Sequence, residues 1–191
     1  MPTVSYALAT LGNAKTFLGI TNSDKDEVLE MLINQATDYL ETKCGRRFAS
    51  TVYTNQEYDG NGTVEMKLQQ FPVITFTTLQ RNRATDNSDD WETVDTDDYW
   101  VENETGIITK TSKFYKGKFN YRATYTAGYA TIPYDLQYAC LTIVSETLNR
   151  RSAMGIKSES LGDHSLTFES LYQSNAVLKD IVSNYRDIPL C

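Results

Sequence analysis

Carboxylates are the reactive side chains that gather most densely in this sequence, and close carboxylates are candidates for acid–base catalysis or calcium binding. The seven acidic residues of this cluster are Asp86, Asp89, Asp90, Glu92, Asp95, Asp97 and Asp98. The common calcium-binding loop also requires a glycine at its turn, and the cluster contains none. Acid–base catalysis depends on how far apart two carboxyl groups lie in space, which chain spacing does not fix. We therefore interpret the cluster as solvated surface.

Nucleophilic catalysis would have to use His164, because it is the only histidine in the chain. This residue lies in a segment rich in glycine and serine, and no strained nucleophile turn occurs elsewhere in the sequence. The sequence also lacks a phosphate-binding P-loop motif and a GxGxxG motif. These observations predict a protein that is not an enzyme and that binds no cofactor.

The three cysteines do not form a metal site by their spacing. Cys44, Cys140 and Cys191 lack the paired spacing of zinc ligands, and they are too few for a disulfide framework. Cys44 and Cys140 fall on the apolar sides of predicted helices, where a free cysteine acts as a small hydrophobic residue. We predict that both are buried core residues and that the chain binds no metal.

Net charge and tyrosine content both bear on nucleic acid binding. The chain has a formal net charge of -7 at pH 7, whereas a protein that grips DNA needs clustered Lys and Arg to displace counterions. Its thirteen tyrosines invite a stacking hypothesis for single strands, but stacking platforms also need basic surroundings. Tyrosine is enriched at protein interfaces as well. We therefore assign the tyrosines to core and interface.

Length and composition indicate one globular domain, with room for an insertion. The chain has 191 residues, of which 40% are hydrophobic and 23% are charged, and this length allows roughly two thirds of the unfolded surface to be buried. No run of about 18 apolar residues exists. The N-terminal sequence MPTVSYALATLG has no basic region followed by an apolar one. We expect a soluble protein that is made in a cytoplasm and has no membrane partner.

Two helices are predicted before residue 46. The first begins at the cap residue Thr10 and stops at Gly19. Ser23 and Asp26 resemble a capping box for the second helix, which ends at Gly45. The apolar side of this second helix consists of Val28, Leu29, Leu32, Ile33, Ala36, Leu40 and Cys44.

Arg46 and Arg47 directly follow this second helix. Their guanidinium groups could meet phosphates or the carboxylates of a neighbouring subunit. They are also cations at a helix C-terminus, where they interact favourably with the helix dipole. Both interpretations stay open at this point.

Residues 51–126 have the alternation of strands. Alternating residues in 52–58 and 63–68 flank the turn sequence Asp59-Gly60-Asn61-Gly62, which predicts a hairpin. A third strand, 74–80, follows Pro72, and the polar residues 82–90 form an exposed loop. Further strands are expected at 91–94, at 99–101, from 106 onward, and in the stretch that ends at 127, which makes up to about seven.

The stretch 121–151 is the centre of the predicted fold, because a strand there leads into a long helix. Tyr121, Ala123, Tyr125 and Ala127 alternate with polar residues, and a helix follows from Pro133 to Arg151. Its apolar stripe is Leu136, Ala139, Cys140, Ile143, Val144, Thr147 and Leu148. Residues 152–167 read as a linker or extended arm. An amphipathic helix is predicted for 168–184, with Pro189 beyond it.

These elements predict an α+β fold within a single domain. We expect a small bundle of about three to four helices, formed by residues 1–48 and 131–191. An antiparallel β region, residues 49–130, is inserted between the two helical parts.

Two stretches of the helical part resemble a known family. The first runs from the short helix through Leu18-Gly19-Ile20 and an acidic cap to Cys44-Gly45-Arg46-Arg47-Phe48. The second runs from YTAGY (125–129) through Ile132-Pro133 and a helix ending in Asn149-Arg150-Arg151 to GIKSESLGDHSLTF (155–168). Together they resemble the head-to-tail connector, or adaptor, proteins of tailed bacteriophages.

The resemblance implies a structural virion protein at the head-to-tail junction, assembled in the host cytoplasm. It implies a ring, dodecameric in related connectors, that binds beneath the portal protein and meets a stopper or tail-completion protein. Double-stranded DNA would pass through the lumen without sequence-specific binding. The candidate interface residues are Arg46, Arg47, Arg150, Arg151, Lys157, Leu161, His164 and Phe168. We also expect weak self-association without a portal, and docking on the portal through residues 155–191.

Two other functions are consistent with the residues. The chain could be another head-completion component, such as a stopper. It could also be a small ligand-binding or carbohydrate-binding module, or a hydrolase, that uses Trp91, Tyr99 and the nearby acids. Such a module would stay monomeric and bind a small ligand, whereas a connector would associate with a portal.

Overall fold

The computed structural model describes residues 2–84, 89–156 and 172–186, and of residues 151–156 only the helical backbone. The chain divides into two compact units. The helical unit contains Met1–Phe48 and Thr131–Pro189, and the β unit contains Ala49–Ala130. This composition is an α+β fold, as predicted. None of the helices in the described ranges is long and apolar enough to cross a membrane.

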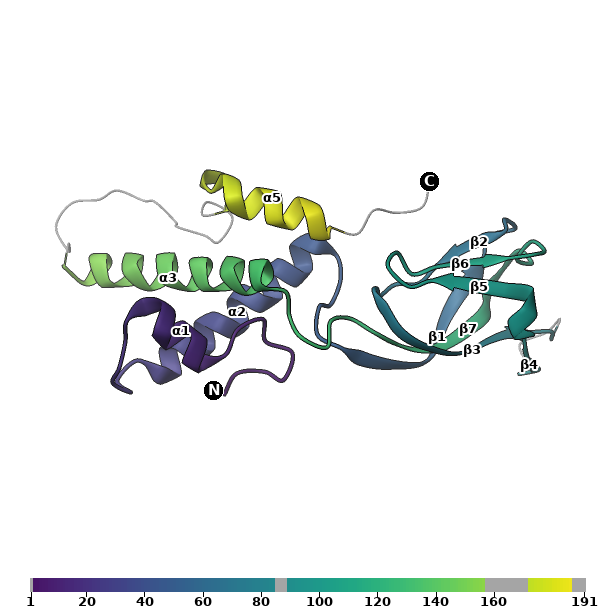
Figure 1. Cartoon of the computed structure of the whole chain (residues 1–191), viewed down its shortest axis with the longest axis horizontal. Coiled ribbons are helices and arrows are strands. Elements are labelled where there is room, and N and C mark those ends of the chain that lie inside the picture. Colours follow the sequence, from purple (N-terminus) through teal and green to yellow (C-terminus); the bar gives the residue numbers. More distant parts are fainter. Residues whose placement is uncertain (1, 85–88, 157–171, 187–191) are drawn as a thin grey trace. The chain divides into compact units, whose positions relative to one another are not determined.

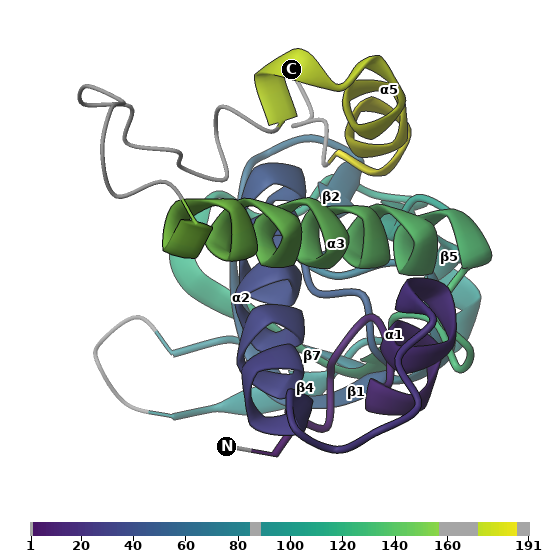
Figure 2. The ribbon, with the colours of Figure 1, turned by 90° about the vertical axis from the view of Figure 1, so that its left-hand side faces the viewer.

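The described helical unit contains four long helices (Figures 1 and 2). They are α1 (Leu11–Leu18), α2 (Asp26–Cys44), α3 (Tyr134–Ile156) and α5 (Ala176–Tyr185). Figure 2 shows α3 crossing α2, with α5 beside α3. Helix α3 runs five residues beyond the predicted end at Arg151, so the predicted linker does not begin at Ser152. Good helix formers there outweigh the cost of Gly155, about 1 kcal/mol relative to alanine.

The ends of the first two helices test the predicted caps. The Thr10 side chain accepts a hydrogen bond from Asn13 N, and Gly19 ends α1 in the left-handed region, as predicted. The Ser23 capping box is wrong, because α2 begins at Asp26 without a side-chain cap. The carboxylate of Asp26 binds the ammonium group of Lys15 at 2.8 Å instead. An ion pair to another helix has replaced the local hydrogen bond.

The core of the helical unit forms where the apolar sides of α2 and α3 meet. Its buried residues include Leu29, Leu32, Ile33, Ala36, Leu40 and Cys44 of α2, and Leu136, Ala139, Cys140, Ile143, Val144 and Leu148 of α3. These are the predicted stripes, except that Val28 and Thr147 are only half-buried. The hydroxyl of Thr147 donates to Ile143 O at 2.7 Å, which satisfies it within the helix.

Helix α5 completes this core. Asn175 caps it by accepting from Leu178 N, and Leu178, Ile181 and Val182 are buried. The Tyr185 ring meets the Phe48 ring edge to face at 5.8 Å, and its hydroxyl donates to the Asp135 carboxylate at 2.8 Å. The helix predicted for 168–184 is therefore confirmed in its second half, while residues 168–171 lie outside the described residues.

The β unit has seven described strands in two antiparallel sheets (Figure 1). The strands are β1 (Thr51–Gly60), β2 (Glu65–Lys67), β3 (Val73–Asn82), β4 (Trp91–Thr93), β5 (Tyr99–Glu102), β6 (Ile107–Lys110) and β7 (Gly117–Ala127). A 3-10 turn, η1 (Thr96–Asp98), precedes β5. One sheet has the order β1-β7-β3-β4 and the other the order β2-β6-β5. The predicted number of strands is confirmed.

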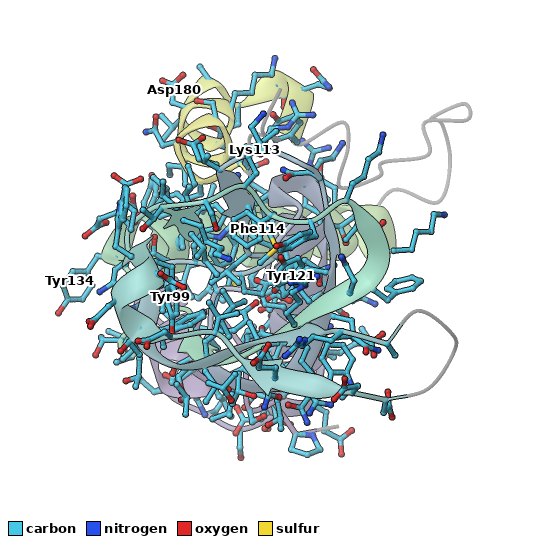
Figure 3. All side chains as sticks on the ribbon, turned by 90° about the vertical axis from the view of Figure 1, so that its right-hand side faces the viewer. Tyr99, Lys113, Phe114, Tyr121, Tyr134 and Asp180 are labelled. Carbon is cyan, nitrogen blue, oxygen red and sulfur yellow. The ribbon has the colours of Figure 1, made fainter. Side chains whose placement is uncertain are left out.

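Strand β7 supplies two of the four buried aromatic residues in the core of the β unit. Its residues Tyr121, Ala123, Tyr125 and Ala127 are buried, as the alternation predicts. The hydroxyls of Tyr125 and Tyr58 share a hydrogen bond of 2.7 Å, which satisfies both groups inside the core. The Tyr121 ring meets Phe114 edge to face at 5.0 Å, and Figure 3 shows these two labelled rings side by side.

The predicted hairpin between residues 52–58 and 63–68 is wrong. Strand β1 pairs with β7, whereas β2 pairs with β6 in the other sheet. The local turn does exist, because the Asn61 side chain accepts from Thr63 N and donates to Glu65 O. It turns the chain from one sheet to the other instead of folding it back on itself.

Candidate functional site

The two arginines singled out by the sequence lie at the C-terminal end of α2. Gly45 ends the helix in the left-handed conformation, with its N–H directed at the last carbonyls. The buried Glu41 side chain reaches across this end, and it accepts from Phe48 N at 3.1 Å. Its second oxygen pairs with Arg47 Nη1 at 3.1 Å. The carboxylate thus ties the helix end to the chain that follows it.

Arg46 and Arg47 differ in exposure. Arg46 is 5% exposed and its guanidinium lies 5.4 Å from the Phe48 ring centroid, so it packs within the protein. The Arg47 side chain is half-exposed and stacks on the Tyr6 ring at 4.6 Å. This placement agrees with a structural role for cations at a helix C-terminus. A contact with a partner stays a prediction, and of the two Arg47 is the more accessible.

Burial raises the pKa of Glu41, against the opposing effects of the Phe48 N–H and Arg47. A raised folded-state pKa means that the folded protein takes up a proton at higher pH than the unfolded chain. The stability from this site should therefore rise as pH falls from 7 through the folded pKa, and be complete below the unfolded value of 4.5. The same stability is lost as pH rises.

Glu41→Gln should remove this dependence, because glutamine does not titrate. The free energy of unfolding of the wild type minus that of Glu41→Gln should increase as pH falls from 7 towards 4.5, with a slope of at most about 1.4 kcal/mol per pH unit. Urea unfolding of both proteins across this range measures the difference, in which the other carboxylates cancel. A difference that is flat or decreases would contradict the raised pKa.

Of the remaining candidate interface residues, only Arg150 has a described side chain. Arg150 lies on α3, where its guanidinium pairs with Glu146 at 3.9 Å, one helical turn away. A surface pair of this kind contributes little to stability. The side chain of Arg151 is not described. The other four candidates, Lys157, Leu161, His164 and Phe168, lie outside the described residues.

The described acidic residues near β4 and η1 are exposed and do not form a metal site. No group of three or more possible metal ligands occurs in the described parts of the chain. Asp95 accepts from Asp97 N as the cap of η1, and Asp89 accepts from the Trp91 indole N–H at 2.9 Å. The Trp91 ring is covered by Arg122 at 4.2 Å, and Tyr99 packs against Phe76 at 5.7 Å. These aromatic residues therefore form no shared open platform for a sugar.

The two described cysteines are buried, as predicted. Burial raises the pKa of the Cys44 thiol to about 11 and that of Cys140 to about 12. Both are therefore protonated thiols at neutral pH, which are poor nucleophiles and poor metal ligands. Cys191 lies outside the described residues.

Sequence reasoning missed an exposed aromatic cluster on the helical unit, formed by Phe17, Tyr134 and Tyr138. The rings of Phe17 and Tyr138 meet edge to face at 6.1 Å, and both side chains are nearly half exposed. Tyr134 lies one turn earlier on α3 and is 85% exposed; Figure 3 shows it projecting from the ribbon. Exposed aromatic clusters are typical of protein interfaces. The sequence does contain a signal for this cluster: Tyr134 and Tyr138 are four residues apart and lie outside the apolar stripe of α3.

A comparison with protein families decides what kind of protein carries these surfaces. The model of the head completion protein family matches residues 7–188, which is nearly the whole sequence. The chain belongs to the head completion protein family. The resemblance to phage head-to-tail connectors is thereby confirmed at the family level, and so is the prediction of a structural virion protein at the head-to-tail junction.

Solved structures share the fold of this head completion protein. A chain in the virion of a native gene transfer agent (GTA) particle superposes with a TM-score of 0.61 at 13% identity, covering 100% of this chain and 95% of that chain. A chain from the neck of an empty GTA particle with C6 symmetry gives 0.56 at 12% identity, covering 100% and 96%. A chain from the neck of a native GTA particle with C12 symmetry gives 0.54 at 13%, covering 95% and 90%.

At these identities the likeness shows the fold alone. It extends over both units, because in each case at least 95% of this chain is covered. The β unit therefore belongs to the shared fold as much as the helical unit does. No curated protein matches the sequence.

Proposed function

We propose that this head completion protein forms a ring, of twelve copies as in related connectors, beneath the portal of a filled head. The ring joins the portal to a stopper or tail-completion protein and leaves a continuous path for double-stranded DNA. The family match over residues 7–188 carries the proposal. The C12 symmetry of the neck in which a protein of similar fold occurs supports the ring and its copy number.

The charge of the chain fits a conduit for DNA. A net charge of -7 gives weak affinity for phosphates, so DNA can slide past without being held. The proposed role is structural and requires no catalysis. The match to a family of head completion proteins supports that view.

Cryo-electron microscopy of filled, tail-less heads mixed with the purified protein tests the proposal. We expect a ring of this chain in direct contact with the portal. A ring one layer further from the portal would mean a stopper, and heads without bound protein would overturn the proposed function. A stable dimer with two-fold symmetry in solution would also count against it, because a ring requires two different patches on each subunit.

The same heads test whether the portal contact lies in residues 157–171. Replacing these residues by a Gly/Ser sequence of equal length keeps α5 connected to α3, so the helical core is retained. We expect this variant to fold, by circular dichroism and thermal unfolding, and to bind heads at least tenfold more weakly. Binding equal to that of the wild type would place the portal contact elsewhere on the chain.

A further inference from the structure

Positive and negative charges are segregated along the sequence of the β unit. Nine Asp or Glu residues and no Lys or Arg lie between residues 86 and 104. Five Lys or Arg residues and no Asp or Glu lie between residues 110 and 122. The whole-chain charge of -7 conceals this second, basic run.

Part of the basic run lies in a bulge at the start of β7. Tyr58 pairs with Tyr121 and Gly60 with Gly117, so the single residue between them on β1 faces three residues, 118–120, on β7. A bulge of this kind turns its side chains out of the sheet. It directs Lys118 and Phe119 to the surface, where both are exposed.

The bulge is fixed by a set of hydrogen bonds. The Asn120 side chain accepts from Gly60 N at 2.7 Å and donates to Tyr115 O at 2.9 Å. The Asp59 carboxylate accepts from Phe119 N at 2.8 Å. A Cβ atom at Gly60 would lie 1.8 Å from Tyr115 O, so only glycine allows this close approach. The surface next to the bulge is therefore preorganised, which lowers the entropy cost of binding a partner.

Two large aromatic residues are exposed among the lysines. Phe119 is 60% exposed and has a φ of 49°, a left-handed conformation that is strained for a residue other than glycine. Tyr115 is 56% exposed and stacks on the Arg81 guanidinium at 3.4 Å. Strain held at an exposed aromatic side chain points to a functional contact. We call Lys113, Tyr115, Lys116, Lys118 and Phe119 the basic bulge.

The lysines of the basic bulge have no counter-charge within the described part of the chain. Lys113, Lys116 and Lys118 are all exposed, and none forms an ion pair with a carboxylate of the described residues. They lie on the side of the unit near the connection from β1 to β2. A Cβ atom at Gly62 would contact the Lys116 side chain, and Phe114 N donates to Thr63 O at 2.7 Å. Lys113 is labelled in Figure 3.

Exposed carboxylates occupy the other flank of the same end of the β unit. They lie on and around β4 and η1, next to the edge strands of both sheets. We define Asp89, Asp90, Asp95, Asp97 and Asp98 as the acidic edge, and all five are exposed. Each β unit thus presents a basic surface and an acidic surface that differ in position and composition.

We propose that the basic bulge of one copy docks on the acidic edge of the next copy in the ring. A head-to-tail ring requires two complementary patches on every subunit, and opposite charges meet that requirement. Phe119 and Tyr115 supply the apolar contact area, and the lysines set orientation and register. This inference rests on the proposed ring.

DNA is a weaker candidate for the same lysines. A phosphate backbone that approaches this end of the β unit also meets the five carboxylates of the acidic edge. Binding by counterion release needs basic residues without such neighbours. A second copy of the chain offers an acidic edge to these lysines and a basic bulge to these carboxylates, so each patch meets the opposite charge.

Charge reversal on each patch tests the proposal through binding to filled, tail-less heads. The first variant carries Lys113→Glu, Lys116→Glu and Lys118→Glu, and the second carries Asp90→Lys, Asp97→Lys and Asp98→Lys. None of these six side chains makes a hydrogen bond or ion pair within the described residues, so both variants should fold. Each alone should reduce the copies bound per head at least tenfold. A Lys25→Glu, Lys179→Glu variant controls for negative charge added outside the two patches, on the helical unit.

Two further samples distinguish a second copy of the chain from DNA or portal as the partner of the lysines. An equimolar mixture of the two variants should recover binding, because acidic and basic copies can alternate in a ring of even number. A chain with all six reversals should also recover binding by itself. Recovery of neither would overturn the proposed contact and point to DNA or portal as the lysines' partner, and normal binding by each single variant would overturn it as well. Failure of the wild type to bind heads would instead overturn the proposed function.

Discussion

Replacing Ile143 with alanine should lower the free energy of unfolding by about 2–5 kcal/mol. Ile143 lies on α3 and is 1% exposed, within the stripe that packs on α2. The loss combines the burial of the removed carbon atoms with the cavity that they leave, because the surrounding helices relax only partly. Urea unfolding followed by circular dichroism measures it.

Val177→Ala is the matched control for this prediction. Val177 is an aliphatic residue on a helix of the same unit, but its side chain is 51% exposed. Its replacement should change stability by about 0.5 kcal/mol or less, as is usual for surface positions. A loss below about 0.5 kcal/mol for Ile143→Ala would mean that this side of α3 is not packed in solution, and the helical core described above would be wrong.

The helical unit was largely predictable from the sequence because its signals are local. The stripes of α2 and α3 repeat every three or four residues, and each helix shows its own period without reference to a partner. Gly19 and Gly45 end their helices for a similarly local reason, the left-handed conformation. Asp26 shows where this reasoning stops, because its ion pair with Lys15 depends on how α1 and α2 pack.

The pairing of the strands was less predictable because it is decided by distant residues. A turn at Asn61 predicts a change of direction but not which strand the chain meets afterwards. β1 instead pairs with β7, with Tyr58 opposite Tyr121, more than sixty residues away. That pairing is stabilised by a buried core in which the Tyr58 and Tyr125 hydroxyls satisfy each other. No pattern within a short window contains this information.

The candidate interaction surfaces were missed for a different reason. Net charge is an average over the chain, and it concealed the five basic residues between 110 and 122. A charge count over short windows would have found them. The positive φ of Phe119 and the close approach of Gly60 to Tyr115 O appear only in three dimensions. These two features turn a basic run into a fixed surface.

Removal of α5 should unfold the helical unit. Leu178, Ile181 and Val182 are buried, and burying each such side chain contributes about 1.5–3 kcal/mol. Their joint loss, roughly 5 kcal/mol or more, is comparable to the whole stability of many domains. Loss of head binding in such a truncated chain would therefore say nothing about the portal contact.

Cysteine reactivity measures this effect at a defined position. The Cys44 thiol lies 3.8 Å from Val182 O, and burial raises its pKa to about 11, so it should react slowly with a thiol reagent in the intact protein. A chain that ends at residue 171 should expose Cys44 and lower its pKa towards 9, the usual value. At pH 8 we expect its reaction rate to rise at least tenfold.

Comparison with Cys140 separates local exposure from global unfolding. Cys140 is buried on α3, and the full-length comparison protein carries Cys191→Ser so that both chains contain the same two thiols. If the unit unfolds as a whole, Cys44 and Cys140 should become reactive together, because the cores of α2, α3 and α5 are continuous. Fast reaction of Cys44 alone would mean that α5 only covers a bundle that is stable without it. Slow reaction of both would show that α5 does not pack on α2 in solution.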